Sequence, residues 1–187
     1  WDPERGALPP AALDGVDAVV NLAGAGVADA RWSAARKDLI RRSRVDATRL
    51  LVRAIGVLPA ERRPRVLVSA SAVGFYGNRG DEVVDERSPQ GTGFLAEVSA
   101  AWEREALAAE AYGIRTVVVR IGVVLGHGGA LARMVPPFRL ALGGRIGSGR
   151  QWMSWIHLDD LVALLAHALE RDDVRGVLNG VAPGAAT

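Results

Sequence analysis

Residues 69–77 read Ser-Ala-Ser-Ala-Val-Gly-Phe-Tyr-Gly, and they follow the apolar run Val66-Leu67-Val68. A short run rich in β-branched residues predicts a strand, and the small and hydroxyl-bearing residues after it predict where that strand ends. Residues 16–24, Val-Asp-Ala-Val-Val-Asn-Leu-Ala-Gly, have the same form. Ligands of open α/β sheets bind at the carboxyl ends of the strands. The two stretches therefore predict a shared nucleotide site at one edge of a sheet.

Strand-like and helix-like segments alternate along the chain. The expected strands are Val16–Leu22, Arg65–Ser69, Arg115–Ile121 and Val177–Val181. The expected helices are Ser33–Ile55, Phe94–Tyr112, Gly129–Leu142 and Leu158–Arg171. The first three strand runs do not alternate between polar and apolar residues, which is typical of strands buried on both faces. The pattern predicts the α/β class, with βαβ units in a doubly wound, Rossmann-like parallel sheet.

Several residues mark where the helices begin and end. Ser33 is placed as an N-cap, and Gly113 is placed to end the second helix. Asp159 and Asp160 fall in the first turn of the last helix, where negative charge is favourable. Pro136-Pro137 is expected to interrupt the third helix.

The order of strands and helices lacks the first strand and glycine-rich turn with which a dinucleotide-binding domain begins. No G-x-G-x-x-G turn follows a first strand. We therefore expect residues 1–187 to form a partial NAD(P)-binding Rossmann-like domain that lacks the first strands of its sheet. The run Val16–Leu22 would then be an exposed apolar edge. Elements on the substrate side are expected at about 127–157 and toward the C-terminus.

Composition excludes several classes of function. The 187 residues include no cysteine, so disulfides, thiol catalysis and thiolate metal sites are excluded. That absence suits a cytoplasmic protein. No run of 18 apolar residues exists, so neither a transmembrane helix nor a membrane partner is expected. With three scattered histidines, we expect no metal site.

Basic residues are concentrated on the expected helix Ser33–Ile55, although the net charge is only +2. They are Arg36, Lys37, Arg41, Arg42, Arg44, Arg49 and Arg53. Aromatic residues do not alternate with them, so no nucleic-acid partner is expected. Two interpretations remain: a solvated helix face, or contact of one or two of these arginines with phosphate.

Four segments carry a family resemblance. They are Asn21–Gly24, Ser69–Gly77, Pro136–Leu140 with Gly143–Gly149, and Trp155–Leu161. In this order they resemble the extended short-chain dehydrogenase/reductase superfamily, and within it the atypical, YfcH-like epimerase branch. The resemblance implies NADP (or NAD) as cofactor and a small-molecule substrate, nucleotide-linked or phosphorylated. It also implies a homodimer that pairs through the helices over 33–55 and 94–112.

The same resemblance implies roles for individual residues. The implied cofactor-binding residues are Asn21, Leu22, Ala23, Gly24, Ser69, Ala70 and Arg120. The implied substrate-binding residues are Arg145, Ser148, Arg150, Gln151 and His157. Ser71 matches the catalytic serine of the superfamily, and Tyr76 is the remaining candidate phenol. Structural roles stay open for Ser71, as a strand-terminal serine, and for Arg120, as an ion-paired residue.

The usual acid/base pair of the superfamily is absent. A Tyr and, four residues later, a Lys should open the helix after the serine strand, where this chain has Phe94 and Val98. The only lysine, Lys37, lies far away in sequence. Tyr76, Glu97 and His157 are the candidates to replace the pair, although a solvated helix face suits Glu97 better. Near-neutral ionisation of a phenol needs a nearby cation.

Two functions follow from these expectations. The first is an NAD(P)-dependent oxidoreductase or epimerase-like protein that acts on a small molecule. The second is a catalytically degenerate NAD(P)-binding regulatory module, which the missing Tyr–Lys pair favours. A scaffold without a nucleotide explains the small residues at the strand ends least well.

Overall fold

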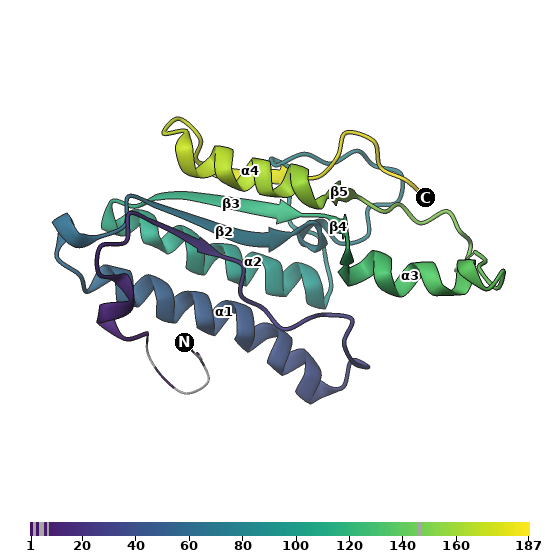
Figure 1. Ribbon diagram of the computed structural model, residues 1–187, viewed down its shortest axis with the longest axis horizontal. Helices are drawn as coiled ribbons and strands as arrows, with labels where there is room; N and C mark the ends of the chain where they lie inside the picture. The colour runs from purple at the N-terminus through teal and green to yellow at the C-terminus, as the bar shows by residue number, and fades with distance from the viewer. Residues whose placement is uncertain (2, 4–5, 7, 146) are drawn as a thin grey trace.

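A four-stranded parallel sheet forms the centre of the molecule (Figure 1). The computed structural model describes residues 1, 3, 6, 8–145 and 147–187. The strands lie in the order β1 (Ala18–Asn21), β2 (Val66–Ala72), β3 (Arg115–Ile121) and β6 (Gly176–Gly180). All three neighbouring pairs are parallel, so the predicted sheet is confirmed.

Helices cover both faces of this sheet (Figure 1). One face carries α1 (Ala34–Gly56) and α2 (Phe94–Leu107), which continues as a 3₁₀ turn over Ala108–Tyr112. The other face carries α4 (Leu158–Glu170). Successive β2 residues point to opposite faces. Leu67 packs in the cluster that contains Ile55 of α1, whereas Val66 and Val68 pack in the cluster that contains Leu161 of α4. The sheet is therefore doubly wound, as the sequence predicts.

A second, two-stranded sheet lies beyond β3. It consists of β4 (Val123–Gly126) and β5 (Trp155–His157), which pair in parallel and which the sequence did not predict. Between them lies α3 (Gly129–Arg139), which contains both prolines, so the expected interruption at Pro136-Pro137 is wrong. Proline removes a backbone donor and leaves a carbonyl without its helical partner.

The predicted capping roles of Ser33 and Gly113 are confirmed. The Ser33 hydroxyl accepts a hydrogen bond from the Arg36 amide at 3.2 Å. Gly113 has the positive φ of 79° that favours glycine at a helix end. Short 3₁₀ turns occur at Pro10–Leu13, Ala60–Arg62 and Val73–Tyr76 (η3).

Strand β1 is an edge of the sheet, and apolar side chains lie open near it. Val20 is 42% exposed and Leu22 is 55% exposed. Among the helices that the structure describes, none is both long and apolar enough to cross a membrane.

Candidate ligand-binding site

A cavity of about 850 Å³ lies beside the segments that follow β2 and β6. Its lining comes from η3, from the chain over 77–84, from 148–154 and from 179–185. Small-molecule sites commonly have volumes of roughly 300–1,000 Å³. The position, at the carboxyl ends of parallel strands, is the one at which α/β sheets bind ligands.

Three of the five predicted substrate-binding residues line this cavity. They are Ser148, Arg150 and Gln151. Arg145 and His157 do not line it. In the described part of the chain, no carboxylate lies within ion-pair distance of the Arg150 guanidinium. Arg150 therefore gives the cavity a cation that is available to an anionic ligand.

Hydrogen bonds hold two of the segments that line the cavity, 77–84 and 148–154. Trp152 Nε1 donates to Asp81 Oδ1 at 2.7 Å and joins loop 77–84 to segment 148–154. Arg79 donates to both carboxylate oxygens of Glu82, at 3.0 and 2.8 Å. These hydrogen bonds lower the pKa of Glu82 below its ordinary value. Because Trp152 is 53% exposed, its ring can also contact a ligand in the cavity.

Tyr76 lines the cavity, but protein groups already bind its phenol. The hydroxyl donates to Asn179 Oδ1 at 2.6 Å and accepts from Arg120 Nη1 at 3.0 Å. Only 4% of the Tyr76 surface is exposed. Asn179 also lines the cavity. A ligand above Tyr76 would therefore meet a phenol whose orientation is fixed from two sides.

Arg120 and Glu103 form a buried ion pair behind this phenol. Arg120 Nε and Nη2 donate to Glu103 Oε1 and Oε2, each at 2.9 Å, and the guanidinium lies 3.5 Å from the Phe75 ring centroid. Burial acts to lower the pKa of Arg120, but the hydrogen bonds to Glu103 and Tyr76 outweigh it and the pKa is raised. The pair keeps opposite charges in contact inside the fold.

Ser71 is directed at the same carboxylate. Its hydroxyl donates to Glu103 Oε1 at 2.6 Å, and Ser71 is 3% exposed and lies outside the cavity lining. Its catalytic role stays a prediction, beside this structural role. We call the five linked residues the Glu103 network. They are Ser71, Tyr76, Glu103, Arg120 and Asn179.

Sequence reasoning missed Glu103 and Asn179. The available signal for Glu103 was its place on the buried face of α2, between Trp102 and Ala106. The signal for Asn179 was a polar residue inside an otherwise apolar strand. Both side chains are used within the Glu103 network.

Two α2 residues lie next to Gly74 of η3. A Cβ atom built on Gly74 of η3 would lie 3.3 Å from Leu95 Cβ and 4.0 Å from Ser99 Oγ. Leu95 and Ser99, which are four residues apart on α2, therefore lie beside Gly74. The Phe94 ring packs edge-on against Trp32, with a centroid distance of 5.4 Å. Neither Leu95 and Ser99 nor the positions predicted for the Tyr–Lys pair supply a phenol and an ammonium.

Lys37 lies closer to this region than its sequence position indicates. Its Nζ atom is 5.5 Å from the centroid of the Phe94 ring. Lys37 itself is exposed at the start of α1. The contact brings the only lysine of the chain to the first residue of α2.

Of the seven predicted cofactor-binding residues, three in succession are exposed. Leu22, Ala23 and Gly24 directly follow β1. The Asn21 amide is buried and donates to Thr48 Oγ1 at 2.8 Å and to Ser69 Oγ at 3.3 Å. The remaining buried members of the set are Ser69, Ala70 and Arg120. Small exposed residues at a strand end let a ligand approach the backbone closely.

The other two candidate acid/base residues, Glu97 and His157, are exposed on the surface. Glu97 is exposed, as the helix-face interpretation expects. His157 is exposed and caps α4, because its Nδ1 accepts from the Asp159 amide at 3.2 Å. Over the residues with described positions, no group of three or more His, Asp or Glu side chains is arranged to hold a metal ion.

Comparisons with known proteins agree with this architecture. Residues 7–179 match the model of the NAD dependent epimerase/dehydratase family. The protein of Arabidopsis thaliana named Epimerase family protein SDR39U1 homolog, chloroplastic, is 51% identical over 172 residues, which are 91% of this chain and 49% of that protein.

Two solved structures are similar over nearly the whole chain. Human SDR39U1 (isoform 2), crystallised with NADPH, has a TM-score of 0.82 and 40% identity, covering 96% of this chain and 60% of that one. The nucleoside-diphosphate sugar epimerase from Corynebacterium glutamicum has a TM-score of 0.85 and 38% identity, covering 100% and 38%. The chain thus spans about half the length of these relatives. With this fold and these matches, the chain belongs to the NAD dependent epimerase/dehydratase family.

Proposed function

We propose that this chain is the NAD(P)-binding part of an NAD(P)-dependent oxidoreductase or epimerase-like protein that acts on a small molecule. The observation that carries the proposal is the 850 Å³ cavity at the carboxyl ends of the parallel strands, with the oriented Tyr76 phenol in its wall. The human relative was crystallised with NADPH, which supports NADP(H) as the cofactor. When bound, a nicotinamide supplies or accepts a hydride.

The described residues fit such a cofactor at the end of β1. Leu22, Ala23 and Gly24 are exposed there, without bulky polar side chains that would block a dinucleotide. Asn21 supports them from below, because its carbonyl oxygen accepts a hydrogen bond from the Ala23 amide at 3.3 Å. We propose these three residues as the accessible cofactor contacts, with Asn21 as a positioning residue.

The substrate is proposed to occupy the cavity. Arg150 would bind an anionic group, and Ser148, Gln151 and Trp152 would bind polar or planar groups. The Corynebacterium glutamicum relative is a nucleoside-diphosphate sugar epimerase. A nucleotide-linked substrate is consistent with the cation and the exposed indole in the lining.

A cofactor titration tests the proposal. Tryptophan fluorescence of the purified protein is followed with NADP(H) and NAD(H) in parallel. Saturable binding with a preference for NADP(H) is expected, and conversion of a nucleotide-linked metabolite should then fall in the Tyr76→Phe variant. A folded protein that binds none of these dinucleotides would refute the proposal.

A second candidate function is a regulatory module that binds NAD(P) without catalysis. Two observations favour it: the Ser71 hydroxyl is bound to Glu103, and α2 presents Leu95 and Ser99 toward η3. Tight binding of NADP(H) with no change of its redox state across a broad panel of metabolites would support this function over the first.

A further inference from the structure

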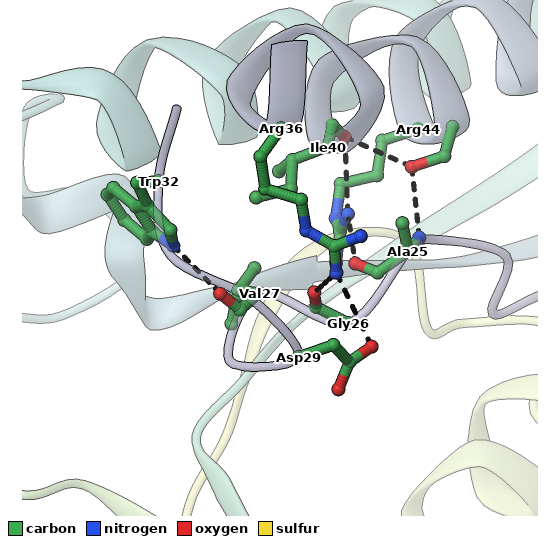
Figure 2. A network of polar contacts seen from close by, with 9 residues as sticks. Ala25, Gly26, Val27, Asp29, Trp32, Arg36, Ile40 and Arg44 are labelled. Atoms are coloured by element: carbon green, nitrogen blue, oxygen red, sulfur yellow. Dashed lines mark hydrogen bonds and ion pairs between the residues drawn. The ribbon is translucent and has the colours of Figure 1, made fainter. Parts of the chain in front are cut away.

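The loop after β1 is held against α1 by three side chains (Figure 2). Ser43 Oγ accepts from the Ala25 amide at 2.9 Å, and Arg44 Nη1 donates to the Ala25 carbonyl at 2.9 Å. Arg36 Nη2 donates to the Gly26 carbonyl. We call Arg36, Ser43 and Arg44 the Arg44 cluster. It fixes the backbone directly after the proposed cofactor contacts.

Positive charge exceeds negative charge in this cluster. Arg36, whose side chain is 16% exposed, has the Asp29 carboxylate at 3.4 Å as an ion-pair partner. Arg44 is half-buried, and no carboxylate in the described part of the chain forms an ion pair with it. Burial, and after it the charge on Arg36, lower the pKa of Arg44. A cation withdrawn from water without a counter-ion is unfavourable, so a bound anion would stabilise this arrangement.

Arg44 also keeps unused hydrogen-bond donors. Its Nη1 donates to the carbonyls of Ala25 and Ile40, at 2.9 and 3.2 Å (Figure 2). Its Nε and Nη2 have no hydrogen-bond partner among the described residues. Arg36 Nε is enclosed by protein and also lacks a hydrogen-bond partner within the part of the chain that the structure describes. The planar guanidinium suits the oxygens of a phosphoryl group, which it can bind through two parallel hydrogen bonds.

The position of Arg44 places these donors at the proposed cofactor edge. A Cβ atom on Gly24 would lie 2.8 Å from the guanidinium carbon of Arg44, so the absence of a side chain at Gly24 admits the guanidinium. The Trp102 ring, whose centroid is 5.3 Å from that carbon, supports it from α2. The guanidinium is therefore set directly beside the exposed segment Leu22–Gly24.

We infer that Arg44, with Arg36 beside it, binds a phosphoryl group of the ligand at the carboxyl end of β1. The inference rests on the proposed function, because the phosphoryl group would belong to the dinucleotide or to a phosphorylated second substrate. The other basic residues of α1 behave differently. Arg42 pairs with Asp38 on the surface, and Arg49 pairs with Glu105. The sequence left two interpretations of the basic helix, a solvated face or contact with phosphate. We assign phosphate contact to Arg36 and Arg44, whose side chains contact the loop after β1.

Calorimetric titrations with NADPH, uridine diphosphate and inorganic pyrophosphate test this inference. Replacing Arg44 by Gln should weaken binding of the phosphoryl-bearing ligand by about tenfold or more, because a charged hydrogen-bond donor is lost. Arg42→Gln is the matched control, since it removes the same charge from the same helix at a residue paired with exposed Asp38. Its dissociation constants should stay within about twofold of the parent values, since exposed charges are screened by salt.

A second variant keeps the test decisive if Arg44→Gln folds poorly by circular dichroism. Gly24→Ala retains both arginines and displaces the guanidinium, because the new methyl group occupies its place. It should weaken binding of the phosphoryl-bearing ligand several-fold.

The three ligands separate the sources of the phosphoryl group. If Arg44→Gln binds NADPH more weakly than the parent protein does, the phosphoryl group belongs to the dinucleotide. If only its affinity for uridine diphosphate falls, the group belongs to the second substrate. Unchanged affinity of Arg44→Gln for all three ligands would overturn the inference, while tight NADPH binding would still support the proposed function. A parent protein that binds no dinucleotide, but loses pyrophosphate or uridine diphosphate binding in Arg44→Gln, would support the inference and refute the function.

Discussion

Two arginine-containing clusters of this molecule are built in opposite ways. In the Glu103 network, Arg120 is 4% exposed and donates to both oxygens of a buried carboxylate. In the Arg44 cluster, the Asp29 carboxylate pairs with Arg36, Arg44 has no carboxylate partner among the described residues, and Arg36 Nε has no hydrogen-bond partner among them. A network whose charges and donors are matched holds a structure together, whereas one with excess charge is suited to a ligand of the opposite sign. The comparison therefore assigns a structural role to the Glu103 network and a ligand-binding role to the Arg44 cluster.

The largest expected effect comes from breaking the Glu103 network. Arg120→Met leaves the Glu103 carboxylate buried without a counter-charge. We expect the free energy of unfolding to fall by about 3–5 kcal/mol, measured by urea denaturation. Arg171→Met is the control, because Arg171 forms an exposed pair with Asp173, and solvent screening leaves such pairs little effect on stability. Equal losses in the two variants would contradict a structural role for the network.

A smaller effect is expected from the phenol that joins this network to the cavity. Tyr76→Phe removes the donor to Asn179 and the acceptor for Arg120. The free energy of unfolding should fall by about 1–3 kcal/mol, because buried polar groups lose a partner. Thermal unfolding followed by circular dichroism measures this. No loss of stability would mean that water replaces the phenol, and that Tyr76 is more accessible than its burial indicates.

The smallest expected effect on stability comes from the Arg44 cluster. Without ligand, Arg44→Gln should change the free energy of unfolding by about 1 kcal/mol or less, because removing a poorly compensated cation offsets the lost carbonyl contacts. The measurement is the same urea titration, in buffer without phosphate. A loss as large as that of Arg120→Met would show that Arg44 is a structural residue, and would erase the difference between the two clusters.

The sequence predicted the sheet well because its strands are short apolar runs with clear ends. The expected strand Arg115–Ile121 is the observed β3, and the capping roles of Ser33 and Gly113 are confirmed. The strand β4 was missed because only Gly122 separates it from β3, and β5 was missed because it has three residues, too few to show a pattern.

The candidate site was harder to predict because its contacts join distant segments. Tyr76 and Asn179 are 103 positions apart, and no local pattern pairs them. Helical periodicity does not fix which α2 residues lie beside Gly74 of η3, so the contact with Leu95 and Ser99 was not predicted. The basic residues of α1 are alike in sequence. Only the path of the loop over 24–29 distinguishes Arg36 and Arg44 from the others.

A crystal structure of the protein with NADPH and a nucleoside diphosphate tests the central claim most directly. We expect a phosphoryl oxygen within hydrogen-bond distance of Arg44 Nε or Nη2, with the contacts of Glu103 to Ser71 and Arg120 unchanged. The claim would be contradicted if every phosphoryl group lay elsewhere and Arg44 kept only the carbonyls of Ala25 and Ile40 as partners.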